Sequence, residues 1–111
     1  MSEVRQLELN DAQEWIKRFY GERGWTDYGP FIRVGFLMEE AGEVARVVRT
    51  YEIGRGRPDE ADQPKAELRR ELVGEIGDVL GNLALLAGLY GITLEEAFDA
   101  HRQKLLKRFE E

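Results

Sequence analysis

The chain has 111 residues, the length of one domain, and it contains no cysteine, which excludes disulfides, thiolate zinc sites and thiol nucleophiles. Its 22 acidic residues outweigh 16 Lys and Arg residues, and the net charge of −6 argues against binding long nucleic acid. Neither a signal-like segment nor a long uninterrupted apolar run is evident. We therefore expect a cytoplasmic protein with no membrane partner.

The first two predicted helices flank a segment that contains Gly and Pro. A helix over about residues 11–22 would take Asn10 as its N-cap, with Gln13 completing a capping box. Pro30 suits the first turn of a second helix over about residues 30–51.

Two further helices are predicted in the second half of the chain. One covers about residues 65–90 and stops at Gly91, because glycine commonly follows a helix end. Thr93 and Glu96 then form a capping box that opens a helix over about residues 93–110.

The remaining pattern defines the fold class. Residues 52–64 are polar and rich in Gly and Pro, which predicts a mobile loop. No segment has the alternation typical of a strand. The sequence therefore predicts one all-α domain over residues 1–111, similar to a four-helix bundle.

The stretch LMEEAGEVARVVR places acids on an otherwise apolar helix. At about 100° per residue, Glu40 falls inside the apolar arc, between Val47 and Tyr51. Glu43 lies at the margin of that arc, and Glu39 lies further out, where solvent is expected. Glu40 and Glu43 are therefore candidates for a role beyond solvation.

The predicted helix over residues 65–90 repeats this pattern. Its second half is apolar nearly all round, yet Glu75, Asp78 and Asn82 share one side, with Glu71 one turn earlier. A lone ionised carboxylate in such a setting costs several kcal/mol, so it is normally neutralised or paired.

The spacings E-x-x-E and E-x-x-D put each acid pair, Glu40 with Glu43 and Glu75 with Asp78, on one helix face. Packing the two helices together would gather four carboxylates, which repel unless a cation lies among them. Oxygen ligands of this kind favour Mg²⁺, Mn²⁺ or Ca²⁺ over Zn²⁺. Solvated acids, or salt bridges to the basic residues, are the alternative. A di-iron site is excluded because His101 is the only histidine.

E-E-A-G-E-V (39–44) followed by E-I-G-D-V-L (75–80) resembles the MazG-like all-α nucleoside triphosphate pyrophosphohydrolases, whose signature is E-x-x-E followed by E-x-x-D. E-R-G-W (22–25), Pro30 and K-L-L-K-R-F (104–109) are also similar, so the resemblance covers most of the chain. The small single-domain branch, which includes dCTP-cleaving enzymes, is the most similar by these motifs.

The resemblance implies Mg²⁺-dependent cleavage of a (deoxy)nucleoside triphosphate between the α and β phosphates, with Mn²⁺ as a substitute ion. The products would be the monophosphate and pyrophosphate, and the role would be house-cleaning of the nucleotide pool. The metal-binding and catalytic residues would be Glu40, Glu43, Glu75 and Asp78, one of which would orient the attacking water. A homodimer or homotetramer is also implied.

The same resemblance suggests substrate contacts. Lys104 and Arg108 match the basic tail of the family and would contact the triphosphate; a solvated basic helix end is the alternative. Asn82 could recognise a base edge, and Trp25 or Phe36 could stack on a base, although all three could instead serve the core.

The dCTP-cleaving relatives usually carry aromatic residues where this chain has Thr50 and Asn82, so the resemblance does not extend to these two positions. Two other functions fit the sequence. One is phosphoribosyl-ATP pyrophosphohydrolase, which would use the same four acids. The other is a non-catalytic helical module for oligomerisation or regulation.

Overall fold

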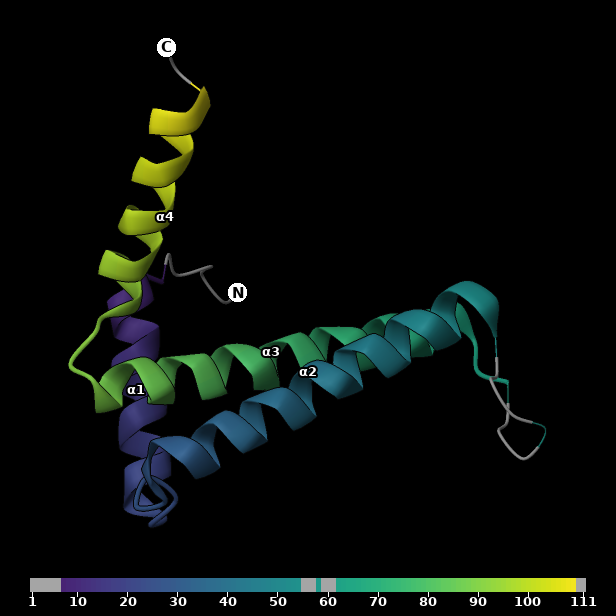
Figure 1. Cartoon of the computed structure of the whole chain (residues 1–111). Helices are drawn as coiled ribbons and strands as arrows, with labels where there is room; N and C mark the ends of the chain where they lie inside the picture. Colours follow the sequence, from purple (N-terminus) through teal and green to yellow (C-terminus); the bar gives the residue numbers. More distant parts are fainter. Residues whose placement is uncertain (1–6, 55–57, 59–61, 110–111) are drawn as a thin grey trace, which may run out of the picture. The chain divides into compact units, whose positions relative to one another are not determined.

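A computed structural model describes residues 7–54, 58 and 62–109, and these form four α-helices with no strand among them (Figure 1). The helices are α1 (Leu9–Glu22), α2 (Gly29–Ile53), α3 (Lys65–Leu89) and α4 (Leu94–Phe109). The all-α prediction is confirmed, and every predicted helix end lies within about two residues of the observed one, the usual uncertainty of helix ends.

The predicted loop over residues 52–64 is shorter at its start, because α2 continues to Ile53. Gly54 follows it with a φ of 79°, a left-handed conformation that glycine adopts without strain. Residues 55–57 and 59–61 lie outside the described residues. The predicted mobility of this loop therefore stays a prediction.

The helices divide into two compact units. The first takes the described residues of Met1–Pro30 and Ala84–Glu111, with α1, α4 and the end of α3. The second takes those of Phe31–Leu83, with most of α2 and α3. The single domain over residues 1–111 stays a prediction.

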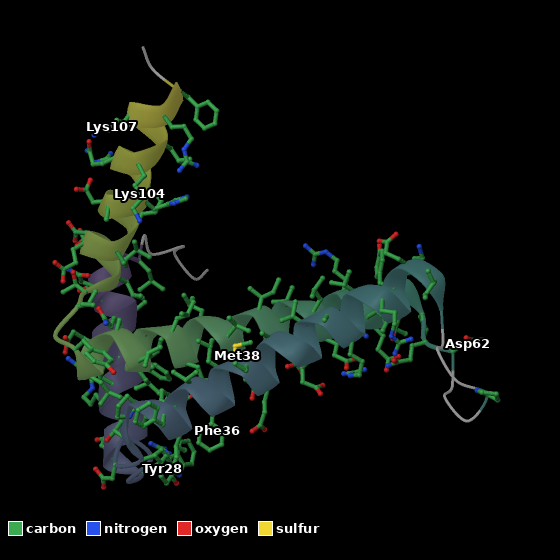
Figure 2. All side chains as sticks on the ribbon, in the orientation of Figure 1. Tyr28, Phe36, Met38, Asp62, Lys104 and Lys107 are labelled. Carbon is green, nitrogen blue, oxygen red and sulfur yellow. The ribbon has the colours of Figure 1, made fainter. Side chains whose placement is uncertain are left out.

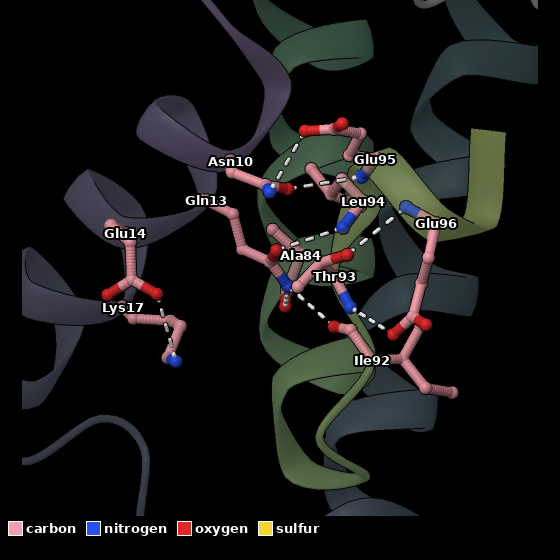
Figure 3. Close-up of polar contacts among 10 residues, drawn as sticks. All are labelled: Asn10, Gln13, Glu14, Lys17, Ala84, Ile92, Thr93, Leu94, Glu95 and Glu96. Atoms are coloured by element: carbon pink, nitrogen blue, oxygen red, sulfur yellow. Dashed lines mark hydrogen bonds and ion pairs between the residues drawn. The ribbon is translucent and has the colours of Figure 1, made fainter. Parts of the chain in front are cut away.

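In the first unit, the predicted cap at the start of α1 is wrong. The helix begins at Leu9, and Glu8 before it makes no side-chain cap bond. Asn10 and Gln13 cap α4 instead: their side-chain oxygens accept the N–H groups of Glu95 at 3.2 Å and Leu94 at 2.9 Å (Figure 3). These N–H groups lie in the first turn of α4 and have no partner within their own helix, so α1 satisfies them.

The capping box of α4 is confirmed. Thr93 Oγ1 accepts the N–H of Glu96 at 3.1 Å, and Glu96 Oε1 accepts the N–H of Thr93 at 2.9 Å (Figure 3). Gln13 adds a second connection, because its Nε2 donates to the carbonyls of Ala84 at 3.1 Å and Ile92 at 3.0 Å. One buried amide thus joins α1 to the end of α3 and the start of α4.

Glycines end α1 and α3 in the same way. Gly24 and Gly91 have φ values of 72° and 68°, which place them in the left-handed region. After Gly91, the N–H of Ile92 turns back to the carbonyl of Ala87 at 2.9 Å, a bond typical of a Schellman motif. The predicted stop at Gly91 is therefore confirmed.

In the second unit, α2 and α3 run side by side (Figure 1). Val47 of α2 and Leu68 of α3 are buried. Two polar bonds also join the helices: Arg46 to Glu71, and Arg33 to Asn82. The acids of E-x-x-E and E-x-x-D therefore lie on neighbouring helices, as predicted.

Within the described part of the chain, α3 is the one helix that is long and apolar enough to cross a membrane by length and composition. The central helix of a helical bundle meets the same criteria, so one such helix is weak evidence for a span. The same helix carries Glu75 and Asp78.

Replacing Gln13 by Ala should lower the free energy of unfolding by about 2–4 kcal/mol. The substitution removes three hydrogen bonds, of which the one to the carbonyl of Ala84 is buried and the other two are partly buried. Urea denaturation at fixed protein concentration would measure the change. Asn10→Ala is the control, because its bonds are exposed and should contribute at most about 1 kcal/mol. Equal losses from the two substitutions would contradict the central role of Gln13.

Candidate metal centre

Three acidic side chains meet in the second unit. Glu40 of α2 and Glu75 and Asp78 of α3 each offer a carboxylate oxygen, and these atoms all lie within 4.8 Å of one another. We call these residues the three-carboxylate cluster. A separation of this size is about twice the 2.0–2.6 Å bond from oxygen to Mg²⁺ or Ca²⁺, so one ion can reach all three oxygens.

The helical repeat explains how the cluster forms. Glu75 and Asp78 are three residues apart on α3, so their side chains share one face of that helix. Glu40 is half-buried at the facing side of α2, as its position inside the apolar arc predicted. Asp78 is exposed, so the cluster is open to solvent on one side.

The electrostatics of the cluster oppose full ionisation. Burial raises the pKa of Glu40 above its ordinary value, and the neighbouring carboxylates of Asp78 and Glu75 raise it further. A hydrogen bond with Glu75 and the charge of Glu43 act in the same direction. In the absence of a cation Glu40 therefore holds its proton more strongly than an isolated glutamate does. A bound cation would remove this repulsion.

The fourth predicted ligand, Glu43, stands outside the cluster. Its Oε2 accepts a hydrogen bond from Nε of Arg46 at 3.1 Å, and its side chain is 48% exposed. Nη2 of the same Arg46 donates to Oε1 of Glu71 at 2.6 Å. The hydrogen bond to Glu71 contributes most to raising the pKa of Arg46, and the bond to Glu43 adds to it, so the guanidinium stays charged. Glu43 and Glu71 thus both form salt bridges with Arg46, and metal binding by Glu43 stays a prediction.

Asn82 belongs to a polar network inside the second unit. It is buried, its Oδ1 accepts from Nη1 of Arg33 at 2.9 Å, and its Nδ2 donates to the carbonyl of Asp78 at 2.9 Å. Arg33 also lies over the ring of Phe36, at 5.3 Å from the ring centre. The alternative of a core network therefore describes this amide, and base recognition by Asn82 stays a prediction.

The aromatic and basic substrate contacts also stay predictions. Phe36 is partly exposed on α2, where Figure 2 labels it. Trp25 is partly exposed in the first unit and packs edge-on against Tyr20, at 5.4 Å between ring centres. Lys104 and Arg108 are exposed on α4, also in the first unit, where Figure 2 labels Lys104.

The sequence analysis did not select two arginines that the structure places among these groups. Arg33 precedes Tyr51 by 18 residues, about five helical turns, so it projects into the same apolar arc. Arg46 follows Glu43 by three residues, the spacing of a helical ion pair. Helical projection could therefore have found both, but only the packing of α2 on α3 supplies their partners.

The residues of the cluster fit a hard divalent cation. Three carboxylates with no sulfur or nitrogen ligand among them suit Mg²⁺, Mn²⁺ or Ca²⁺.

Comparison with known proteins identifies the family. The sequence model of the MazG nucleotide pyrophosphohydrolase domain matches residues 33–111, which include both acid pairs, and the chain belongs to this family. It is 62% identical over 104 residues to the uncharacterized protein YvdC of Bacillus subtilis, covering 94% of this chain and 98% of YvdC.

A second relative connects the sequence to a solved structure. The uncharacterized protein YpjD of Bacillus subtilis is 33% identical over 100 residues, covering 90% of this chain and 85% of YpjD. The crystal structure of YpjD, described as a candidate pyrophosphatase, matches with a TM-score of 0.72 at 28% identity. The match covers 92% of this chain and 96% of that chain, which confirms the all-α MazG fold.

Replacing Glu40 by Gln should stabilise the metal-free protein at neutral pH. Because folding raises the pKa of Glu40, the folded state loses stability as the pH rises from the ordinary value of 4.5 through the raised value. Gln carries no charge, so the variant should avoid this loss and unfold at a higher temperature than wild type above that pH range. Thermal unfolding in EDTA at pH 5 and pH 7.5 would measure the difference.

Added Mg²⁺ should reverse this order, because wild type gains a ligand-stabilised state that the Gln variant largely loses. Glu39 is an exposed neighbour outside the three-carboxylate cluster, so Glu39→Gln serves as the control. It should unfold at the same temperature as wild type, both in EDTA and with Mg²⁺. A variant that is less stable than wild type in EDTA at pH 7.5 would contradict the proposed repulsion.

Proposed function

We propose that this protein is an Mg²⁺-dependent nucleoside triphosphate pyrophosphohydrolase that converts ribo- or deoxyribonucleoside triphosphates to monophosphate and pyrophosphate. The observation that carries the proposal is the three-carboxylate cluster, formed by the acid pairs of a chain that belongs to the MazG family. One of its relatives, YpjD, is described as a candidate pyrophosphatase, which supports the proposal.

The proposed reaction requires one phosphoryl transfer to water. The water oxygen forms a bond to the α phosphorus, the bond from this phosphorus to the bridging oxygen breaks, and pyrophosphate leaves with that oxygen. A carboxylate takes the proton of the water. Bound Mg²⁺ would neutralise the triphosphate and polarise the phosphoryl oxygen.

The chain's own residues divide this work by position. Glu40, Glu75 and Asp78 converge closely enough to hold the ion, and we assign Glu43 to the same site as its fourth carboxylate. One carboxylate that is less engaged by the ion would orient the water. We assign Lys104 and Arg108 to the triphosphate, because cationic side chains offset charge that the metal leaves uncompensated.

The proposal also includes a homodimer or homotetramer. The described part of the chain fully buries few apolar side chains, Val47 and Leu68 among them, whereas the second unit exposes many. Its exposed apolar side chains, each at least 40% accessible, include Val34, Met38, Val48, Val73, Ile76, Leu80 and Leu83. An apolar surface of this extent is unusual for a monomer and is best covered by another copy of the chain.

Clearance of unwanted nucleotides in the cytoplasm is the role that the proposed hydrolysis of nucleoside triphosphates would serve.

Incubation with a panel of nucleoside triphosphates should release monophosphate and pyrophosphate in equal amounts, and only when Mg²⁺ or Mn²⁺ is present. Asp78→Asn should lower kcat/KM at least about a hundredfold, since even residues that only support metal ligands contribute ten- to a hundredfold. Chromatographic separation of the products would measure both effects.

The control is Asp99→Asn, an exposed acid on α4 outside the three-carboxylate cluster, which should keep full activity. Orthophosphate as the first product would contradict cleavage between the α and β phosphates. Turnover of phosphoribosyl-ATP alone would favour the alternative of a phosphoribosyl-ATP pyrophosphohydrolase, and no turnover of any substrate would favour the non-catalytic module.

Gel filtration with light scattering should give a mass of two or four times 12.8 kDa. Replacing Ile76 and Leu80 on the exposed apolar face of α3 by Lys should shift the mass toward the monomer, because charged residues there would be buried by association. Replacing exposed Arg102 by Lys is the control and should leave the mass unchanged. A wild-type mass of 12.8 kDa would contradict the proposed oligomer.

A further inference from the structure

Arg46 forms an ion pair with one of the four motif carboxylates, which are the acids of E-x-x-E and E-x-x-D. Its Nε donates to Oε2 of Glu43 at 3.1 Å, and Glu43 lies three residues after Glu40 on the same helix. The cluster of oxygens within 4.8 Å contains Glu40 but not Glu43, although both are described. Glu43 must therefore move before it can share an ion with the other three.

The two bonds of Arg46 differ in strength and setting. The bond to Glu71 of α3 is short, at 2.6 Å, and the Glu71 side chain is 29% exposed. The bond to Glu43 is longer, and the Glu43 side chain is 48% exposed. Thr50 further fixes the backbone, since its Oγ1 donates to the carbonyl of Arg46 at 2.9 Å. The guanidinium is thus anchored across the two helices, and Glu43 is the partner that can leave.

We propose that Arg46 is a positioning residue that holds Glu43 outside the three-carboxylate cluster, so that a divalent cation must take this carboxylate from the guanidinium to gain its fourth protein ligand. The inference rests on the proposed function, because it treats all four motif carboxylates as ligands. The contact also limits repulsion in the metal-free site, since one of four negative charges is neutralised by the chain itself.

This arrangement weakens metal binding by the strength of one half-exposed ion pair. Such pairs contribute little, which corresponds to about a two- to fivefold change in an equilibrium constant.

The test is Mn²⁺ binding by the full chain without nucleotide, followed by the electron paramagnetic resonance signal of free Mn²⁺. Arg46→Gln should lower the Kd about two- to fivefold relative to wild type. Arg102→Gln is the matched control, because it removes an ion pair of the same spacing, to Asp99 at 2.6 Å on α4. Its Kd should equal that of wild type, and circular dichroism would show that both variants fold.

A double-mutant cycle separates positioning from a general effect of charge. In a Glu43→Gln background, Arg46→Gln should lower the Kd less than it does in wild type, because the contact with Glu43 is already gone and only the contact with Glu71 is released. If Arg46→Gln tightens binding equally in both backgrounds, the effect is one of net charge and the inference is overturned. An unchanged or weaker affinity of the single Arg46→Gln variant also overturns it.

Failure of the inference is distinguishable from failure of the proposed function. If neither wild type nor Arg46→Gln binds Mn²⁺, the metal site itself is contradicted, and the inference with it. If the Mn²⁺ affinities follow the expected order but no nucleotide is hydrolysed, the metal site and the role of Arg46 stand, and the proposed activity is contradicted.

Discussion

Mutual repulsion among carboxylates is the constraint on which the rest of the second unit depends. Packing α2 against α3 brings the acid groups of Glu40, Glu75 and Asp78 within 4.8 Å of one another. A fold optimised only for stability would not place them so, because burial and neighbouring charge both oppose ionisation of Glu40. The chain keeps this local conflict, and a bound divalent cation would relieve it, which supports the metal site that we propose.

Two arginines of the second unit bond to polar side chains near the three-carboxylate cluster, in different settings. Arg46 neutralises Glu43 and Glu71 at the edge of the cluster, where solvent weakens the interaction. Arg33 is buried and bonds to Asn82, whose amide in turn bonds to the carbonyl of Asp78. Arg33 and Asn82 thus form a buried polar pair that reaches the backbone of a cluster residue.

Most of the helical pattern could be read from local signals. The capping box at Thr93 and the glycine stop at Gly91 involve neighbouring residues only, and both were predicted correctly. The predicted N-cap at Asn10 was wrong in its partner. Asn10 and Gln13 do act as capping residues, but they accept N–H groups of α4 instead of α1. Capping residues are recognisable in a sequence, but the helix that they cap depends on which N–H groups come near.

The sequence by itself determined four helices, the pairing of E-x-x-E with E-x-x-D, and the placement of Glu40 on an apolar face, because these follow from helical periodicity and spacing. The tertiary structure decided which carboxylates meet. Glu40 joins Glu75 and Asp78, whereas Glu43 turns to Arg46, and Arg46 reaches Glu71 on the other helix. Periodicity gives the direction in which a side chain leaves its own helix, but the partner that it finds depends on the register and separation of two helices, which no local pattern contains.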